Sequence, residues 1–280
     1  MSVGGGMWGG GAGVGYADLP ALDTAATTGG GGTAPTSAGF TPVTDRGSDA
    51  YGLLVGTTPG LVHWWRFAQA FANWGGKVDY APFFSNSAGA GALGAIANVP
   101  SLGAPFVKGS PGSVRLNNGH LWGFEYHVTG GNDEIITLEA WVKPLSLPAD
   151  GAICASWQSG VGYLLHLQNT GAVTFNIHGQ AVGSPAGTIA VGGTYHVVGV
   201  CGGVQAANPD YTSRLYVNGV EVGNANLSPN QAILGSSDQF RVGNFASGAG
   251  GSWDGYVAEV AIYSRMLQPA EVLAHYNAGK

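Results

Sequence analysis

The stretch SRLYVNGVEV, residues 213–222, decides the fold class, because it predicts a β-hairpin closed by a two-residue turn. Asn-Gly accepts the positive φ that both central positions of a type I′ turn require. On both sides of Asn218-Gly219, apolar and polar residues alternate with the period of a strand. Leu215 and Val217 should therefore share one face with the two valines that follow the turn. A hairpin of this kind favours an antiparallel β domain.

Strand patterns extend from this hairpin toward the N-terminus. Residues 173–178 alternate strictly, and a three-residue hairpin loop containing Gly171 connects them to a strand at 163–168. Residues 195–201 are apolar almost throughout, which suits a strand covered on both faces. These segments predict a sheet of several strands around the first hairpin.

The C-terminal part continues the strands and then changes to a helix. Strands are expected at 240–244 and 256–263. The sequence Gln268-Pro269-Ala270-Glu271 places Pro at the first helical position and Glu three residues after the cap, and Gly279 can end the helix. We expect a short helix that docks on the β domain through its apolar side.

The composition argues against nucleic acid and membrane partners. The chain has 280 residues, with 10 Lys or Arg against 16 Asp or Glu, and a net charge of −6. No basic cluster provides the footprint that phosphate binding needs, and no apolar run is long enough to span a bilayer. Cys154 and Cys201 lie in apolar, strand-like runs, so buried free thiols are favoured over a disulfide.

Residues 1–58 differ from the rest, since Gly, Ser, Thr, Ala and Pro dominate and no apolar period is sustained. Such a segment cannot bury enough surface to offset its ordering entropy alone. It is either a flexible tail or an extended arm that orders on a partner. The second alternative is suggested by spaced apolar residues that could act as anchors. These anchors are Trp8, Tyr16, Leu19, Leu22, Phe40 and Tyr51. The expected parts are therefore a Gly-rich arm at 1–58 and a folded domain at 59–280.

Four segments of the folded domain resemble the laminin-G-like, concanavalin A-like family. They are TLEAWVKP at 137–144, TYHVV at 194–198, LYVNGV at 215–220 and GYVAEVAIYSRML at 255–267. The resemblance implies an all-β fold, namely a two-sheet antiparallel jelly-roll sandwich with a short C-terminal helix. Ala258 stands where family members often carry an acidic residue, so no structural calcium is expected. The stretch 69–105, rich in small residues, departs from the compact family pattern and is expected to be a long loop.

The residues show no motif for catalysis, a metal or a cofactor. Retaining glycosidases need two carboxylates about 5 Å apart, but Asp133 and Glu134 are adjacent and so point to opposite faces of a strand. Glu139 is expected on the outward phase of its strand, with no acidic neighbour two residues away. The histidines are scattered, without His-x-His spacing. We therefore expect no enzyme activity, no catalytic residue, no metal ligand and no cofactor.

Aromatic residues supply the candidate ligand contacts, because aromatic faces can stack on sugar rings as well as fill a core. Strand positions or a packing role place four tryptophans in the expected core: Trp64, Trp65, Trp141 and Trp253. Positions near turns, in loops or at a strand end favour exposure for others. The candidate glycan contacts are Trp157, Tyr211 and Asn244.

A Gly-rich arm ahead of a laminin-G-like sandwich resembles structural proteins of tailed bacteriophages. Residues 1–6 lack the basic and apolar regions of a secretion signal, which agrees with a virion protein assembled in the host cytoplasm. The resemblance implies a minor tail or capsid decoration protein that contacts other virion proteins through its arm, as a homo-oligomer in the particle. Its sandwich would bind host-surface glycans or coat the particle. The alternative is a bacterial cell-surface or secreted carbohydrate-binding module.

Overall fold

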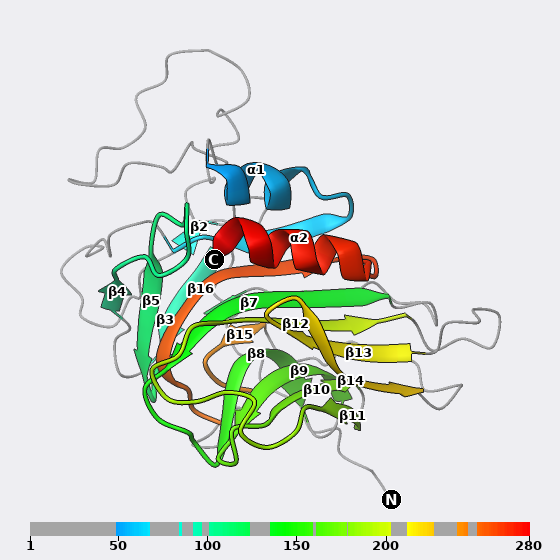
Figure 1. Cartoon of the computed structure of the whole chain (residues 1–280). Coiled ribbons are helices and arrows are strands. Elements are labelled where there is room, and N and C mark those ends of the chain that lie inside the picture. Colours follow the sequence, from blue (N-terminus) through cyan, green and yellow to red (C-terminus); the bar gives the residue numbers. More distant parts are fainter. Residues whose placement is uncertain are drawn as a thin grey trace, which may run out of the picture. The chain divides into compact units, whose positions relative to one another are not determined.

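Strands dominate the described part of the chain, with one helix near each end of it (Figure 1). The computed structural model describes residues 49–67, 84–85, 92–96, 101–123, 135–158, 161–177, 179–202, 212–226, 240–245 and 251–280. The elements in chain order are α1 (Ala50–Thr57), β1 (Leu61–Trp65), β2 (Phe84–Ser85), β3 (Ala92–Ile96), β4 (Ser101–Gly103), β5 (Ser113–Asn117), β6 (His120–Gly123), β7 (Ile136–Pro144), β8 (Asp150–Gln158), β9 (Val161–Gln168), β10 (Val173–Ile177), β11 (Gln180–Gly183), β12 (Tyr195–Cys201), β13 (Thr212–Val217), β14 (Val220–Asn226), β15 (Arg241–Val242), β16 (Asp254–Tyr263) and α2 (Pro269–Gly279). None of the helices within these ranges is both long and apolar enough to cross a membrane.

The strands form two sheets that pack face to face. Sheet A has the order β14-β13-β12-β7-β16-β5-β4, and β1 also pairs with β16. Sheet B has the order β11-β10-β9-β8-β15-β6-β3-β2. Neighbouring strands are antiparallel throughout. The expected all-β, two-sheet antiparallel sandwich with a short C-terminal helix is confirmed.

Strand alternation builds the core between the two sheets. Leu138 and Val142 of β7 join Leu165 and Leu167 of β9 in one cluster, each 0% exposed. Full burial of such a side chain stabilises the fold by roughly 1.5–3 kcal/mol. Of the four tryptophans expected in the core, Trp65 and Trp253 join this cluster. Trp64 and Trp141 are buried in a second cluster on the other side of sheet A. The inner faces of both sheets therefore supply most of the apolar stabilisation.

The two cysteines lie in this β framework as predicted. Cys154 of β8 and Cys201 of β12 are buried free thiols. Burial raises the pKa of the Cys154 thiol far above its ordinary value, so this group stays protonated and unreactive.

The Asn-Gly hairpin has the predicted turn, with one difference in the strands. Asn218 has φ +53° and Gly219 has φ +77°, so both central residues are left-handed as a type I′ turn requires. Val217 pairs with Val220, but the register shifts between Leu215 and Tyr216. Because of this shift, Leu215 lies opposite Gly223 and not Val222. Val220, next to the turn at the hairpin end, is 62% exposed.

Strands occur inside the stretch 69–105, which corrects the expectation of one long loop. β2 and β3 join the edge of sheet B, and β4 joins the edge of sheet A. Their residues are mostly Ala, Gly, Ser and Leu, which have weak strand propensity, so the local sequence gives little signal. Pairing with β5 and β6 supplies what the propensity lacks.

Both helices pack on the outer face of sheet A, the face turned away from sheet B (Figure 1). The predicted start of α2 is confirmed, and Glu271 accepts a hydrogen bond from the Gln268 backbone N–H at 2.8 Å. Asp49 caps α1 by accepting from the Gly52 backbone N–H at 2.6 Å. Tyr51 and Val55 of α1 share an apolar cluster with Val272 of α2.

The packing of α1 moves the expected domain boundary at residue 58. Residues 49–58 belong to the folded unit, and Tyr51, expected as an anchor of the arm, is 1% exposed against its own sheet. The helix was not evident in the sequence because AYGLLVGT has no polar face and contains two glycines. The rest of the expected arm, with Trp8, Tyr16, Leu19, Leu22 and Phe40, lies outside the described residues.

Candidate functional site

Two carboxylates, Glu139 of β7 and Glu259 of β16, lie on the outer face of sheet A. The residues on either side of Glu139, Leu138 and Ala140, belong to the core between the sheets, so the pleat turns Glu139 to the other face. Glu139 does point away from that core, as its strand phase predicts. It is nevertheless 0% exposed, because α1 and α2 cover this face.

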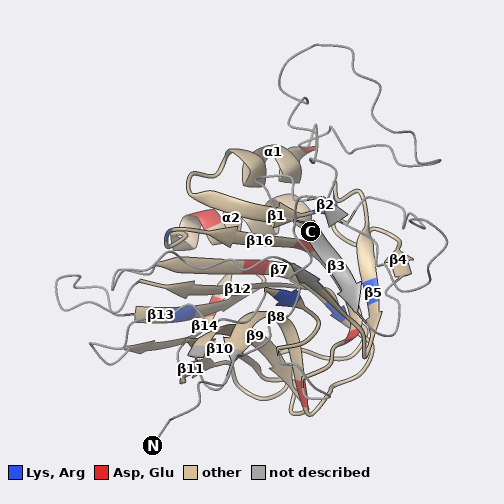
Figure 2. Ribbon diagram, turned by 180° about the vertical axis from the view of Figure 1, so that it is seen from behind, with Lys and Arg blue, Asp and Glu red and all other residues tan. Residues whose placement is uncertain are grey.

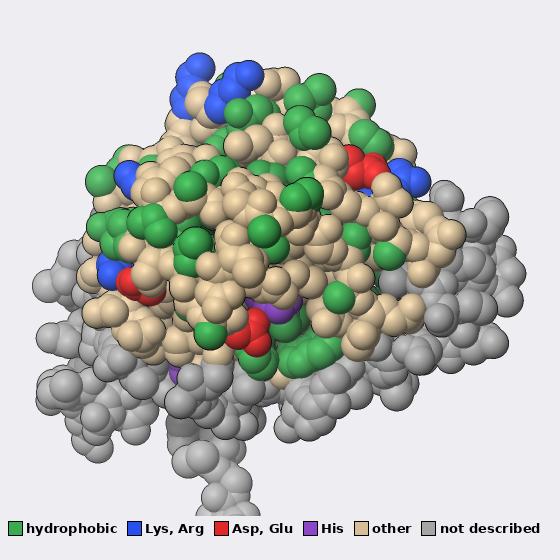
Figure 3. Space-filling view, turned by 60° about the horizontal axis from the view of Figure 1, so that its bottom comes forward, with side chains coloured by type: hydrophobic (Ala, Val, Ile, Leu, Met, Phe, Trp, Pro, Cys, Tyr) green, Lys and Arg blue, Asp and Glu red, His purple; other side chains and the backbone are tan. Residues whose placement is uncertain are grey.

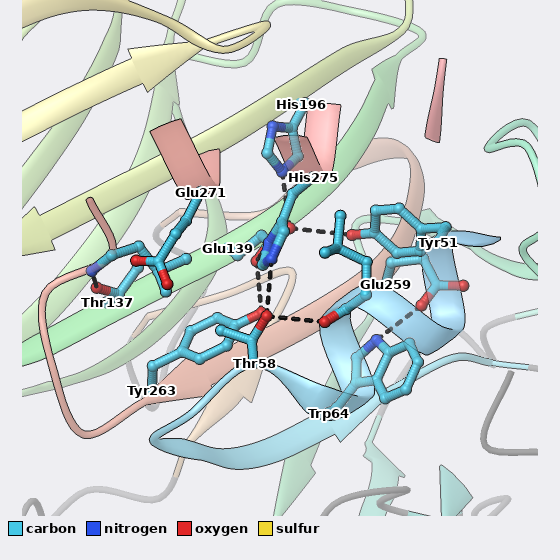
Figure 4. A network of polar contacts seen from close by, with 12 residues as sticks. Tyr51, Thr58, Trp64, Thr137, Glu139, His196, Glu259, Tyr263, Glu271 and His275 are labelled. Atoms are coloured by element: carbon cyan, nitrogen blue, oxygen red, sulfur yellow. Dashed lines mark hydrogen bonds and ion pairs between the residues drawn. The ribbon is translucent and has the colours of Figure 1, made fainter. Parts of the chain in front are cut away.

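Four side chains converge on the Glu139 carboxylate (Figure 4). The Tyr51 hydroxyl donates to Oε1 at 3.0 Å and His196 Nε2 lies 2.8 Å from the same oxygen. The Tyr263 hydroxyl donates to Oε2 at 2.7 Å. His275 Nδ1 lies 3.0 Å from Oε2 and 3.2 Å from Oε1. Every lone-pair direction of the carboxylate is therefore served by a donor from another element.

The charges in this network favour an ionised Glu139. Burial would raise the pKa of Glu139, but the charge of His275 and the hydrogen bonds from both histidines hold it well below its ordinary value. Burial lowers the pKa of His275, but the charge and hydrogen bond of Glu139 and the charge of Glu271 together outweigh it, and the pKa is raised. Burial and the Glu139 charge raise the pKa of Tyr51 and of Tyr263 well above the ordinary value. Both phenols therefore remain neutral donors.

Glu259 forms a second centre beside the first one. The Trp64 indole N–H donates to its Oε2 at 2.7 Å, and Arg66 Nε donates to Oε1 at 3.1 Å. Arg66 Nη2 also reaches Asp49 Oδ2 at 3.0 Å and the Gly109 carbonyl at 2.8 Å. Burial raises the pKa of Glu259 to about 7, against the opposing charge of Arg66.

The backbone at Glu259 is strained. Its φ of +51° is left-handed, which is uncommon for a residue with a side chain. The residue lies in the register shift of β16 between Ala258 and Ala261, opposite β7. The strain costs of order 1–3 kcal/mol, and the bulge directs the carboxylate to Arg66 and Trp64.

The network ties several elements together without an exposed reactive atom. Glu139, His196, Glu259 and Tyr263 are each 0% exposed, and His275 is 1% exposed. Three strands of sheet A, β1 and both helices contribute a side chain. In this arrangement the network fastens the helices to the sheet. Within the described ranges, no group of three or more His, Cys, Asp or Glu could hold a metal ion.

Sequence reasoning missed this network because its members are far apart in the chain. Tyr51 and Glu139 are 88 residues apart, and Glu139 and His275 are 136 residues apart. One signal was present: Trp141 lies two residues from Glu139 on the same strand face. A large apolar residue on the supposed outer face indicates that another layer covers it.

The outer face of sheet B carries Trp157, one of the predicted ligand residues. Trp157 of β8 and Phe245, just after β15, are partly buried and pack against Ala152, Ala155 and Leu164. Figure 3 turns this side of the sandwich forward, and charged side chains are few and scattered there. Figure 2 shows the same sparse distribution along the described strands.

Polar groups border this aromatic cluster on β9 and β10. His166 lies opposite Thr174 and Ala152, and its Nδ1 makes a short contact with Asp150 Oδ1. Asn176 lies opposite Leu164, and its buried Oδ1 has no hydrogen-bond partner. An acceptor in that state costs about 1–3 kcal/mol, which a bound donor would recover.

The three candidate glycan contacts have different outcomes. Trp157 is half-buried on the outer face of sheet B. Asn244 directly precedes Phe245 but is 3% exposed, so its side chain is not at the surface as expected. Tyr211 lies outside the described residues. Phe245 was missed, because only the packing of the loop after β15 brings it onto the same cluster as Trp157.

Solved structures share the fold at low sequence identity. A Trypanosoma rangeli sialidase mutant with trans-sialidase activity matches 79% of this chain with a TM-score of 0.53 and 18% identity. This chain spans 33% of that sialidase chain. Domain 4 of AbnA, a GH43 extracellular arabinanase from Geobacillus stearothermophilus in complex with arabinotriose, matches 77% of this chain and 98% of its own, with a TM-score of 0.52 and 15% identity.

A third similar structure is a toxin domain. The binding domain of Botulinum neurotoxin DC in complex with SialylT matches 69% of this chain and 48% of its own, with a TM-score of 0.52 and 13% identity. No curated protein matches the sequence.

These likenesses correct the expectation that the chain is not an enzyme. Chains from two glycosidases, the sialidase and the arabinanase, share its fold. The missing carboxylate motif was therefore no sufficient ground for that expectation, and a chain of this fold can be part of a glycosidase.

The family is shown by the sequence itself. Residues 113–273, more than half of the chain, match the profile of the concanavalin A-like lectin/glucanases superfamily. The matched range includes the core of both sheets and the first turn of α2. The chain therefore belongs to the concanavalin A-like lectin/glucanases superfamily.

Proposed function

We propose that the chain is a lectin-like module that binds a glycan on the outer face of sheet B. The observation that carries this proposal is two partly exposed aromatic side chains, Trp157 and Phe245, which pack against the same small cluster of Ala152, Ala155 and Leu164. Two proteins of the same fold were solved with carbohydrate ligands, the arabinanase domain with arabinotriose and the neurotoxin binding domain with SialylT. Family membership and an aromatic cluster on one sheet face point to the same class of ligand.

The register of sheet B places a polar acceptor at a useful distance from the aromatic pair. Trp157 lies opposite Gly162, and Ala155 lies opposite Leu164, which is opposite Asn176. Standard strand spacing puts the Cα atoms of Trp157 and Asn176 about 12 Å apart. That span suits a short oligosaccharide, with one ring stacked on Trp157 and another beside the partly exposed Asn176 side chain, whose buried Oδ1 would turn outward to accept a hydroxyl. Gly162 and Ala155 between them leave room for the ligand to lie against the sheet.

Binding of arabino-oligosaccharides and sialylated oligosaccharides, measured by calorimetry, tests this site. Trp157→Ala should weaken binding about tenfold, because stacking beyond area burial contributes about 0.5–1.5 kcal/mol in addition to the lost contact area. Trp157→Phe keeps an aromatic face and should retain most of the affinity. Leu53→Ala, at an exposed position of α1 on the other side of the sandwich, is the matched control. Equal binding by Trp157→Ala and the native chain would place the site elsewhere.

The same mixtures of protein and oligosaccharide also test whether the chain hydrolyses these oligosaccharides. Chromatography of the oligosaccharides after incubation would reveal shorter products if the chain is a glycosidase. Trp157-dependent binding is the outcome that the lectin-like proposal requires, whether or not the oligosaccharides are shortened.

We also propose that the chain is part of a bacteriophage virion. In the virion it would be a minor tail or capsid decoration protein assembled in the host cytoplasm. The support is the Gly-rich composition of residues 1–48, with the spaced residues Trp8, Tyr16, Leu19, Leu22 and Phe40 as anchors on neighbouring virion proteins or further copies of the chain. Host-surface glycans would then be the ligands. The alternative is that the chain is a bacterial cell-surface or secreted carbohydrate-binding module and not a virion protein.

Deletion of residues 1–48 tests whether this segment attaches the chain to a virion. The truncated chain should keep its sandwich, because Asp49 and α1 remain, and should fail to enter purified particles. Full incorporation of the truncated chain would assign attachment to the sandwich. Recovery of the native protein from the cell surface or medium, with none in particles, would favour the alternative.

A further inference from the structure

We propose that His275 is a proton-operated clasp, which holds the last turn of α1 against α2 when its ring is doubly protonated and loosens that turn when a proton is lost. This inference concerns the outer face of sheet A and does not depend on the glycan site. It rests on the direction of a chain of hydrogen bonds that runs from Glu139 through His275 and Thr58 to α1.

The hydrogen bonds of Thr58 indicate which way the proton lies between Thr58 and His275 Nε2. Thr58 Oγ1 lies 2.8 Å from the Leu54 carbonyl oxygen and 3.0 Å from His275 Nε2. The carbonyl can only accept, so the single hydroxyl proton of Thr58 points to Leu54. The hydroxyl oxygen then accepts from His275, and Nε2 must carry a proton.

The contact with Glu139 indicates the protonation of the other ring nitrogen, His275 Nδ1. His275 Nδ1 lies 3.0 Å from Oε2 of a carboxylate that also receives donors from Tyr51, Tyr263 and His196. An ionised carboxylate only accepts, so Nδ1 also carries a proton. With both nitrogens protonated, the buried ring is an imidazolium paired with Glu139.

The charges that face His275 come from every element around it. Burial of the ring lowers the pKa of His275, whereas the charge and hydrogen bond of Glu139 on β7 and the charge of Glu271 on α2 raise it. Arg265, just after β16, opposes them. The net direction is upward, in agreement with the hydrogen-bond directions. The neutral neighbours are the Tyr51 and Tyr263 phenols, and His196 of β12 completes the ring of groups around Glu139.

Loss of either proton breaks one side of the clasp. If Nε2 is deprotonated, it becomes an acceptor, and the Thr58 hydroxyl must turn away from Leu54 to donate to it. If Nδ1 is deprotonated, its lone pair faces the Glu139 carboxylate. In the first case the last turn of α1 loses the bond from Thr58 to the Leu54 carbonyl, and in the second α2 loses its bond to Glu139. The contacts of Asp49 and Tyr51 at the first turn of α1 remain.

The direction of the pH effect follows from linkage. His275 binds its proton more tightly in the clasped state than in an open one. The contribution is therefore complete below the ordinary histidine pKa of about 6.5 and is lost as the pH rises through the higher pKa of the clasped state. For each pKa unit gained on clasping, opening becomes about tenfold easier across this window.

Hydrogen exchange of the full chain between about pH 6 and about pH 9, corrected for the intrinsic pH dependence of exchange, tests the clasp. Protection of residues 50–58 should fall as the pH rises, while protection of β7 (residues 136–144) stays constant. Thr58→Val, which cannot accept the bond, should remove this pH dependence, and Thr58→Ser should retain it. His275→Gln should give low and pH-independent protection of α1.

Two results would overturn the proposal. One is constant protection of residues 50–58 in the native chain across the pH range, or an unchanged pH response in Thr58→Val. The other is independent of any variant: nitrogen-15 spectra near neutral pH that show His275 with only one protonated ring nitrogen. Spectra with two protonated nitrogens that lose one proton together with α1 protection are the expected result.

Discussion

The two outer faces of the sandwich are built from the same kind of strand and serve different ends. On sheet A the outward residues include Glu139, Trp141 and Glu259, which two helices bury completely. On sheet B the outward residues around Trp157 and Phe245 are small or aromatic, and the aromatic pair stays partly exposed. The difference indicates that ionisable side chains in this fold are not a reliable guide to the ligand face. Here they mark the face that is closed.

The largest effect is expected from the centre of the closed face. Glu139→Gln leaves the His275 imidazolium buried without its counter-ion, and breaking a buried pair in this way costs about 3–5 kcal/mol. Urea denaturation at constant pH measures the loss. Glu221→Gln, at an exposed position of β14, is the matched control and should cost less than about 1 kcal/mol. Similar midpoints for the two variants would show that the face is less closed than its burial indicates.

A second effect is the pH dependence of stability. Burial raises the pKa of Glu259 to about 7, above its value of about 4.3 in an unfolded chain. The folded state therefore holds a proton that the unfolded state has lost, so the free energy of unfolding should fall as the pH rises from about 4.5 to about 7. The decline should be on the order of 2–3 kcal/mol.

The acid side should show the opposite slope. The pKa of Glu139 is held well below its ordinary value by His275 and His196, against burial. Its contribution is present above about pH 4.5 and is lost as the pH falls further. Denaturation curves across the whole range should show a maximum near pH 4.5–5. A free energy that rises steadily from pH 5 to pH 7 would contradict the protonated state of Glu259.

A smaller effect is expected at the hairpin beside α2. Gly219 has φ +77°, and a Cβ there would lie 2.9 Å from Leu273 Cδ1. Gly219→Val should therefore cost on the order of 1–2 kcal/mol or more, from the left-handed backbone and the contact with α2. Gly187→Val is the matched control, because φ is +76° and no atom lies within 4 Å of an added Cβ. Equal losses in thermal or urea denaturation would mean that the contact with α2 contributes nothing.

The smallest effect on stability is expected from a substitution on the outer face of sheet B. Trp157→Ala removes a half-buried side chain and should cost about 1 kcal/mol, within the range of ordinary substitutions. The same truncation at Trp141, which is 1% exposed under the helices, should cost about 3–5 kcal/mol. Comparison of the two denaturation midpoints measures the difference between the faces directly. A large loss at Trp157 would make it a core residue and remove it as a ligand contact.

The sequence was most informative where structure depends on neighbours in the chain. The Asn218-Gly219 turn and the start of α2 follow from local backbone preferences, and both are present. The strands β3 and β4 have weak propensity of their own and form through pairing, so they were not recognised. The fold class could still be predicted, because the strongly patterned strands of the core identify it.

The candidate sites were harder to predict, because they depend on contacts between distant segments. The strand phase of Glu139 was predictable, but its burial depends on Tyr51 and His275, 88 and 136 residues away. Trp157 was identified from a turn signal, whereas Phe245 reaches the same cluster only through the packing of β15 on β8. Residue type and local pattern cannot supply that pairing.

The place of α1 also determines how a carried sandwich would meet its target. The chain that precedes Asp49 joins the sandwich at the start of α1, on the outer side of sheet A (Figure 1). The aromatic pair lies on the outer side of sheet B, across both layers of the sandwich. The face that carries Trp157 therefore lies across the sandwich from Asp49, the residue where that segment joins it. Several copies on one particle could then engage one surface together, and weak individual contacts would combine into a much tighter multivalent one.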